Sequence, residues 1–171
     1  ITPGNASGDE YGLSVSISGT YAIVGAYAEN TNGNRAGAAY IYERNGSGTW
    51  PQVPTILYAS NADAYDEFGY SVAISGNYAI VGAKYADHSG LSNPGAAYIF
   101  VRDGDTWIEQ TKLIASDASS EDMFSFDAVA ISGNYAIVGA AYDDTDASRD
   151  GSAYIFVRDG ETWSQHAKLN P

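Results

Sequence analysis

Acidic residues that could bind a cation gather in one loop of the chain, at residues 143–151. Asp144, Asp146 and Asp150 alternate there with other residues, and Gly151 follows the last of them. Ca²⁺ takes about six to eight oxygen ligands, and carboxylates spaced in this way on a turning loop can converge on one ion. If this loop binds a cofactor, the pattern predicts calcium at these three aspartates. The alternative is an ordinary solvated loop, because the corresponding loops at residues 29–34 and 87–93 hold fewer carboxylates.

No catalytic residues are predicted. The two histidines, His88 and His166, fall at different positions of the repeating pattern described below, and neither has a patterned Ser or Asp partner. The chain has no cysteine, which excludes a thiolate nucleophile, a thiolate metal site and a disulfide framework. No carboxylate pair recurs at an inward strand position, where burial would tune a pKa for acid–base catalysis. We therefore expect a protein that is not an enzyme.

Two sequons, at Asn5 and Asn45, are candidates for N-glycosylation if the chain is secreted. Both lie in turn-rich stretches, which are predicted to be exposed. Asn45 is the better acceptor of the two, because it lies at the tip of a predicted hairpin.

A ten-residue motif returns three times and organises the whole chain. It reads Ile-Ser-Gly-Asn/Thr-Tyr-Ala-Ile-Val-Gly-Ala and occupies residues 17–26, 74–83 and 131–140, with a spacing of 57 residues. Each copy predicts a strand end, a tight polar turn and a second strand that is apolar on both faces. Repetition at a fixed period indicates units that cannot cover their own cores. The 171 residues thus divide into three units, 1–59, 60–116 and 117–171.

Two further strand signals complete each unit as a four-stranded antiparallel blade. Residues 37–42, 95–100 and 151–156 predict a third strand, and residues 50–59 and 107–115 predict an outer strand in the first two units. The fold class is all-β, with β-propeller-type repeats. Because propellers close with about four to eight blades, three blades must belong to a larger propeller or to a head-to-tail assembly.

Glycine near the end of the second strand is expected to allow a neighbouring blade to approach closely. These glycines are Gly25, Gly82 and Gly139. Replacing Gly82 or Gly139 with Val is therefore predicted to be far more damaging than changes in the loops.

The composition excludes several classes of partner. With 21 acidic against 8 basic residues the net charge is −13, which repels phosphate backbones, so we expect no nucleic-acid partner. No apolar run is long enough to predict membrane insertion. Because the sequence starts at Ile1 rather than Met, we expect a processed chain or an excerpt of a longer one.

The Phe68-Gly69 pair at the start of the second unit, together with Val-Gly-Ala at the end of its second strand, resembles the FG-GAP repeat of integrin α-subunits. The chain is most similar to the variant of that repeat found in predicted secreted proteins. In the first unit Tyr11 replaces the Phe, in the third unit the Phe-Gly pair is lost at Phe124-Ser125, and Lys84 stands where the motif has Pro. The resemblance implies a β-propeller scaffold that is extracellular or at the cell surface. It does not imply the family's calcium site between strands one and two, because a short Ser-Gly-Asn/Thr turn takes that place.

Three functions are compatible with these expectations. The first is a non-catalytic extracellular scaffold or adhesion module that binds protein or glycan partners. The second is a structural subunit of a head-to-tail extracellular fibre or ring. The third, with the least support, is a secreted sugar-active enzyme. Assembly from identical chains, or from further repeats of the same chain, is expected because joining the two ends nearly preserves the repeat spacing. The joined ends place 13 residues between Leu169 and Tyr11. The internal spacings are 11 residues from Leu57 to Phe68 and 12 from Leu113 to Ser125.

Overall fold

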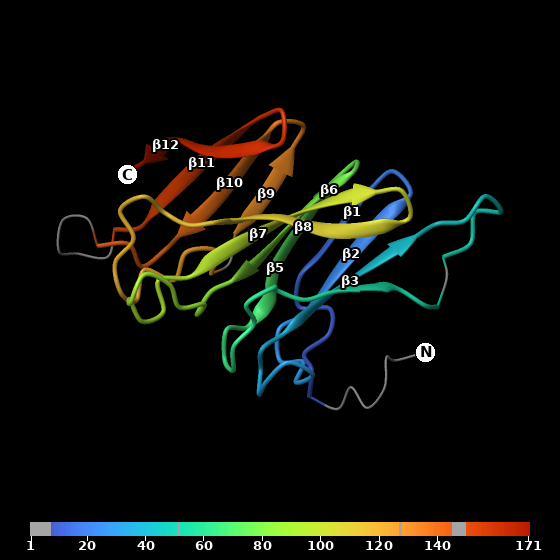
Figure 1. The fold of residues 1–171 in the computed structure, drawn as a ribbon, viewed down its shortest axis with the longest axis horizontal. Helices are drawn as coiled ribbons and strands as arrows, with labels where there is room; N and C mark the ends of the chain where they lie inside the picture. Colours follow the sequence, from blue (N-terminus) through green and yellow to red (C-terminus); the bar gives the residue numbers. More distant parts are fainter. Residues whose placement is uncertain (1–7, 51, 127, 145–149) are drawn as a thin grey trace.

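The computed structural model describes residues 8–50, 52–126, 128–144 and 150–171. Within these ranges the chain forms three antiparallel four-stranded sheets, which confirms the expected all-β blades (Figure 1). The first sheet contains β1 (Val15–Ser18), β2 (Tyr21–Ala26), β3 (Ala38–Glu43) and β4 (Thr55–Leu57). The second contains β5 (Phe68–Ser75), β6 (Tyr78–Ala83), β7 (Ala96–Asp103) and β8 (Thr106–Leu113). The third contains β9 (Val129–Ser132), β10 (Tyr135–Ala140), β11 (Ser152–Asp159) and β12 (Thr162–Leu169).

In each sheet the strands follow one another in chain order, as expected for strands joined by hairpins. Five of the hairpins have loops of only two residues, and each begins with a glycine at φ between 56° and 60°. Glycine reaches this left-handed conformation at no steric cost, which is what a tight hairpin turn of this kind requires. These glycines are Gly19, Gly76, Gly104, Gly133 and Gly160.

The outer strand of the first sheet is much shorter than the sequence suggested. Residues 50–59 were expected to form it, but β4 covers only Thr55–Leu57. Pro54 lies directly before the strand and donates no backbone hydrogen bond, so pairing with β3 starts only after it. The outer strand of the second sheet, β8, matches the expected residues 107–115 to within two residues at each end.

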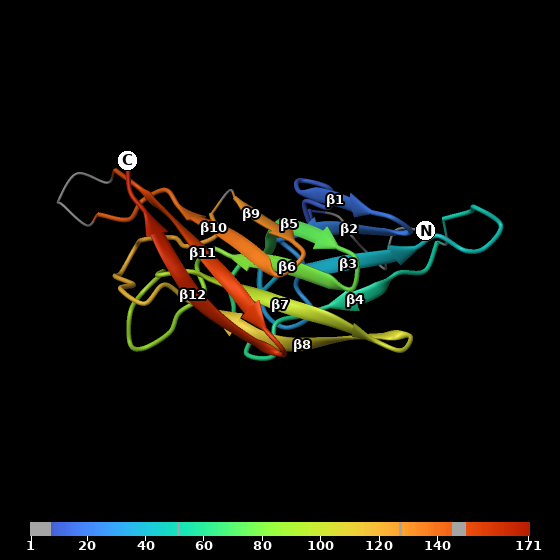
Figure 2. The same ribbon diagram turned by 90° about the horizontal axis from the view of Figure 1, so that it is seen from above.

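The second sheet lies between the other two, and two separate apolar cores fill the gaps (Figures 1 and 2). Side chains of the first and second sheets form one core, which includes Ile23, Ile41, Phe68 and Val81. Side chains of the second and third sheets form the other core. That core includes Ile80, Ile99, Phe124, Val138 and Tyr154. The three sheets therefore stack face to face, in the manner of neighbouring propeller blades.

The two ends of the sheets differ. The long β2–β3 and β6–β7 connections lie at one end, and the tight β1–β2 and β7–β8 hairpins lie at the other (Figure 1). We call the first of these the loop-bearing end. Within the described ranges no helix is long and apolar enough to span a membrane.

Candidate functional site

The segments that lead into the second and third sheets are each fastened to the preceding sheet through backbone atoms. The N–H groups of Glu67 and Phe68 donate to the carbonyl oxygens of Arg35 and Ala36, and Phe68 forms a parallel bridge with Gly37. At the next junction the N–H groups of residues 123 and 124 donate in the same way to the carbonyls of residues 93 and 94, and residue 124 bridges to residue 95. The sheets are thus joined by a repeated backbone connection.

These bridges show that Phe124, not Ser125, occupies the place of Phe68. Both phenylalanines are fully buried. The spacing from the preceding outer strand is therefore 11 residues at both junctions, and the value of 12 counted to Ser125 is wrong. Ser125 takes the place of Gly69 at φ 73°, where its hydroxyl donates to the carbonyl of Ala96 at 2.7 Å.

Half-buried aromatic rings form a continuous row at the loop-bearing end, across all three units. Tyr70 lies 4.9 Å from the ring of Tyr27 and stacks on Phe126 at 5.5 Å, and Phe126 meets Tyr142 edge-on at 5.3 Å, all between centroids. We call these four residues the aromatic row. Aromatic pairs in such geometries add about 0.5–1.5 kcal/mol beyond the area that they bury.

A buried cation supports the middle of the aromatic row. The Lys84 ammonium lies 3.4 Å from the ring centroid of Tyr70 and 4.6 Å from that of Phe126. Its nitrogen also pairs with Glu67 Oε2 at 3.0 Å. Both side chains are almost completely buried, whereas Arg35, the second partner of Glu67, is 39% exposed. This ion pair and these ring contacts hold the row at fixed positions.

Besides the Lys84–Glu67 ion pair, a cluster of polar side chains lies on the third sheet. The carboxylate of Asp143 accepts a hydrogen bond from the Tyr154 hydroxyl and pairs with Lys168 at 2.7 Å, and Lys168 also pairs with Asp117 at 2.7 Å. Burial acts against the charge on Lys168, but the hydrogen bonds to Asp117 and Asp143 outweigh it and raise its pKa above the usual range. Asp143 is therefore a structural residue of this sheet.

The first unit carries the buried acid of this cluster without the lysine. Glu29 lies in the loop position of Asp143, and Ile56 pairs with Tyr40 as Lys168 pairs with Tyr154. The Oε1 atom of Glu29 accepts from Thr31, but its buried Oε2 atom has no hydrogen-bond partner among the described residues. The clusters thus differ between units, and no common binding site recurs in them.

The sequence profile of the FG-GAP repeat matches residues 1–42, 50–100 and 107–156, which is most of the chain. The chain belongs to the FG-GAP repeat family. The second and third matched segments each begin at the outer part of one sheet and end within the third strand of the next. An FG-GAP repeat of this chain therefore spans a junction between sheets, while the unit boundaries at 59/60 and 116/117 stay a prediction. No curated protein matches the chain significantly.

The glycines near the ends of the second strands differ in how closely other atoms approach them. A Cβ atom on Gly25 would lie 1.9 Å from the carbonyl oxygen of Gly69, so the strand-two glycine and the motif glycine are in direct backbone contact. A Cβ atom on Gly82 would lie 2.3 Å from the Ser71 hydroxyl. Among the described residues, a Cβ atom on Gly139 would meet only Ala128, its Cβ at 3.3 Å and its carbonyl oxygen at 3.8 Å. The structure therefore separates Gly139 from the two glycines that the sequence grouped with it.

The predicted calcium ligands are not brought together within the described part of the chain. Asp144 and Asp150 are both exposed, and Asp146 lies outside the described residues. No group of three or more His, Asp or Glu side chains suited to a metal ion occurs among the residues that the structure describes. Calcium at Asp144, Asp146 and Asp150 stays a prediction.

The other candidate residues lie far apart. Asn45 is exposed in the β3–β4 hairpin, where its Oδ1 atom accepts from the N–H groups of Ser47 and Thr49, while Asn5 lies outside the described residues. His88 is in the β6–β7 connection, where burial and the nearby charge of Lys112 lower its pKa. His166 is exposed on β12.

The two outermost sheet faces of the FG-GAP array are open, which sequence reasoning inferred only from the number of units. On the first sheet Val15 and Ile17 are 65% and 67% exposed, whereas Val72 and Ile74, at the same register of the second sheet, are each 5% exposed. On the third sheet Ile137 is 39% exposed, and its counterpart Ile80 is fully buried. Each open face therefore carries the same apolar side chains that are buried between sheets at the internal junctions.

The buried ion pair between Lys84 and Glu67 was missed at the level of sequence. The two residues are 17 positions apart, and no motif pairs them. A signal was nevertheless present, because only the second unit has an acidic and a basic residue at these two positions, whereas the first unit has Glu10 and Tyr27 there. The third unit has Ala141 and Met123 at the corresponding positions.

Proposed function

We propose that the chain is a non-catalytic, extracellular scaffold or adhesion module that binds a protein or glycan partner at its loop-bearing end. Membership of the FG-GAP family supports a propeller-type module. The aromatic row is the observation that carries the choice of surface, because it crosses all three units and its rings are half exposed.

Rigid, half-exposed aromatic rings suit recognition for two physical reasons. They offer large contact areas with little conformational entropy to lose on binding. The buried Lys84 and its contacts with Tyr70 and Phe126 fix the rings before a partner arrives, and a surface organised in advance pays less on association. The partner is expected to be neutral or cationic at its contact surface, since the chain carries a net charge of −13.

Binding to a glycan array and to a panel of purified extracellular matrix proteins tests this proposal. Phe126→Ala should weaken any binding at least tenfold, because Phe126 contacts both Tyr70 and Tyr142. Trp50→Ala is the matched control, since Trp50 is a half-exposed aromatic residue of the β3–β4 hairpin. Equal loss in both variants, or no binding to any probe, argues against the loop-bearing end as the site. Release of sugar from an array glycan would instead support the sugar-active enzyme.

The second candidate function is a structural subunit that assembles head to tail. The two open sheet faces favour it, because apolar side chains that are buried elsewhere in the fold are exposed there. Light scattering at micromolar concentration tests it. A mass above 18.0 kDa supports the subunit, and a monodisperse, thermally stable 18.0 kDa species excludes it.

A further inference from the structure

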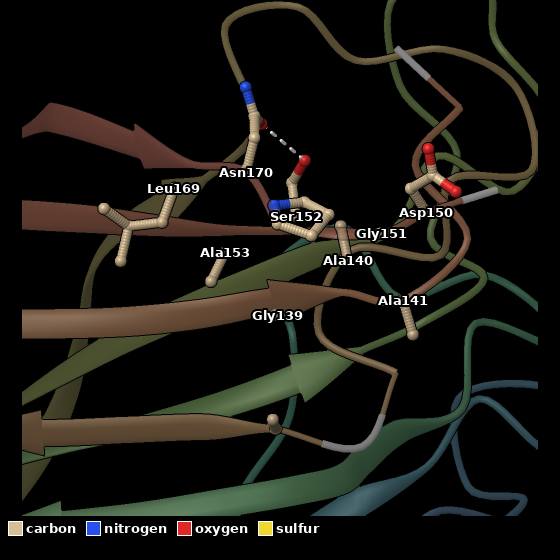
Figure 3. Close-up of a pocket in the computed structure, with 11 residues that line it drawn as sticks. Gly139, Ala140, Ala141, Asp150, Gly151, Ser152, Ala153, Leu169 and Asn170 are labelled. Atoms are coloured by element: carbon tan, nitrogen blue, oxygen red, sulfur yellow. Dashed lines mark hydrogen bonds between the residues drawn. The ribbon is translucent and has the colours of Figure 1, made fainter. Parts of the chain in front are cut away.

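The open face of the third sheet contains a pocket of about 460 Å³ at the end where β10 and β11 meet the chain terminus (Figure 3). Small residues form most of its wall, and one larger apolar side chain closes it. The residues that matter here are Ala128, Gly139, Gly151, Ala153 and Leu169.

The same position is filled by phenylalanine at both junctions inside the chain. In the second sheet Gly95, Ala97 and Leu113 correspond to Gly151, Ala153 and Leu169, as the strand pairing shows. There Phe124 is fully buried in one core with Ala97 and Leu113. A Cβ atom on Gly95 would lie 2.3 Å from the Phe124 carbonyl oxygen, so its glycine is required by the aromatic segment that covers it.

The open face of the first sheet offers the matching aromatic group. Tyr11 packs edge-on against Tyr40 at 5.3 Å between ring centroids, as Phe68 packs on Tyr98 at 5.4 Å. Its hydroxyl is hydrogen-bonded to that of Tyr42. The Tyr11 ring thus occupies the position that Phe68 has on the second sheet. Tyr11 is nevertheless 43% exposed, because no sheet covers it.

The glycine after this ring adopts the conformation of the internal motif. Gly12 has φ +97°, and Gly69, which follows Phe68, has φ +91°. Gly69 touches the preceding sheet with its backbone, since a Cβ on Gly25 would meet its carbonyl oxygen. Gly12 is therefore shaped for the same contact with Gly139, which has open space in front of it.

We propose that the pocket at Gly139, Gly151 and Leu169 receives the Tyr11-Gly12 turn of a second copy of this chain. This inference rests on the second proposal above, the head-to-tail subunit, and not on the first. It continues an interface that the chain forms twice internally. The receiving face has the same residue types at the same register, and the incoming face has Tyr11 in place of phenylalanine.

A second hollow on the third sheet extends the same junction. It has a volume of about 270 Å³ and is lined by Ala130, Ile137 and Ile155 among others. The corresponding residues of the second sheet, Ala73, Ile80 and Ile99, share a core with Ile131 of β9. Ile17 of the incoming copy has the register of Ile131 and fills this hollow in the junction.

Charge acts against this association and gives it a salt dependence. Each copy carries a net charge of −13, so two copies repel each other at long range, and added salt screens that repulsion. We expect the association to tighten as the salt concentration rises, which is opposite to the behaviour of a contact held by opposite charges.

The sharpest test is Gly139→Ala, because its clash exists only in the assembly. Inside one chain the new methyl group meets only Ala128 among the residues that the structure describes. In the junction it points at the Gly12 carbonyl, as a methyl group on Gly25 would point at that of Gly69. Sedimentation across a concentration series should show association weakened at least tenfold, with an unchanged circular dichroism spectrum. Gly46→Ala is the control, since no atom of the described residues lies within 4 Å of its Cβ position.

Tyr11→Ala tests the opposite face, and Tyr11→Phe should restore association because phenylalanine fills this position in the other two units. A mixture of Gly139→Ala with Tyr11→Ala decides the orientation of the contact. Each variant keeps one intact face, so a head-to-tail contact joins them into a particle of twice the chain mass that grows no further.

The outcomes of these experiments distinguish the proposal about the pocket from the proposal that the chain is a head-to-tail subunit. A parent chain that stays at 18.0 kDa at all concentrations and salt levels overturns both proposals. An association that neither Gly139→Ala nor Tyr11→Ala weakens overturns the pocket and leaves the subunit standing. Continued dimerisation of one variant alone, without mixed particles, shows a symmetric contact and overturns the head-to-tail arrangement.

Discussion

Replacing Lys84 with Ala should destabilise the fold strongly, because the change leaves a buried carboxylate behind. Lys84 pairs with Glu67 at 3.0 Å, and both side chains are less than a tenth exposed. Removing one partner of a buried ion pair costs about 3–5 kcal/mol, and the contact of Lys84 with the Tyr70 ring is worth up to about 2 kcal/mol when desolvated. Arg35 stays beside Glu67 and offsets part of this loss.

We therefore expect Lys84→Ala to lower the free energy of unfolding by about 3 kcal/mol. For a chain of this size each kcal/mol lowers the Tm by about 2–4 °C, so the Tm should fall by about 6–12 °C. The third unit supplies the compensating change, since it has Met123 and Ala141 at the positions of Glu67 and Lys84. Replacing a whole buried pair with apolar residues is often neutral. The double variant Glu67→Met, Lys84→Ala should therefore be within about 1 kcal/mol of the parent.

Urea unfolding of the parent, both single variants and the double variant gives the coupling energy between the two positions. The backbone of residue 67 is not an obstacle to methionine, because Met123 adopts φ 51° where Glu67 adopts φ 56°. A Lys84→Ala midpoint equal to that of the parent would refute the reasoning. So would a double variant whose loss equals the sum of the two single losses.

Three further predictions concern the junctions, pH and metal. Gly25→Ala should lower the free energy of unfolding by about 1–3 kcal/mol, because its methyl group would lie 1.9 Å from the Gly69 carbonyl oxygen. An unchanged Tm would contradict the close backbone contact between the first and second sheets. Burial raises the pKa of Asp66 and Asp122, so the folded state binds their protons more tightly than the unfolded state does. The Tm should therefore rise as the pH falls from neutrality towards about 4.5, and a steady fall would contradict this. Calorimetry should show weak Ca²⁺ binding at most, abolished by Asp146→Ala, whereas tight binding that survives the change places the site elsewhere.

The sequence predicts the elements of this fold well where the repeat is regular. The motif around residues 74–83 predicts β5, β6 and their tight turn, because alternating apolar residues and a Ser-Gly-Asn turn act locally. The outer strand of the first sheet was predicted too long, since its pairing depends on Pro54 and on the partner strand β3. Local patterns determine strands, but pairing determines where strands end.

The contacts between units were harder to predict, for a physical reason. Lys84 and Glu67 meet only after β5 and β6 have paired, and the aromatic row needs all three sheets in place. Tyr11 and the pocket near Gly139 lie on the two open faces of the array, so no contact between described residues reveals that they match. The signals lie in the differences between the three units, both in departures such as Lys84 and in glycines such as Gly139 that lack the close backbone contact of their counterparts.

The backbone connection between sheets has a consequence for how such proteins can change over generations. Glu67 is acidic and Met123 is apolar, yet their N–H groups make the same hydrogen bonds to the preceding sheet. A connection made of main-chain atoms does not depend on most side chains, so most substitutions leave it intact. The left-handed conformations and the close glycine contacts must persist. Duplication of one unit inside a gene would therefore yield a new sheet that fits its neighbours at once. We therefore expect units of this architecture to be added without loss of the connection while their sequences drift apart.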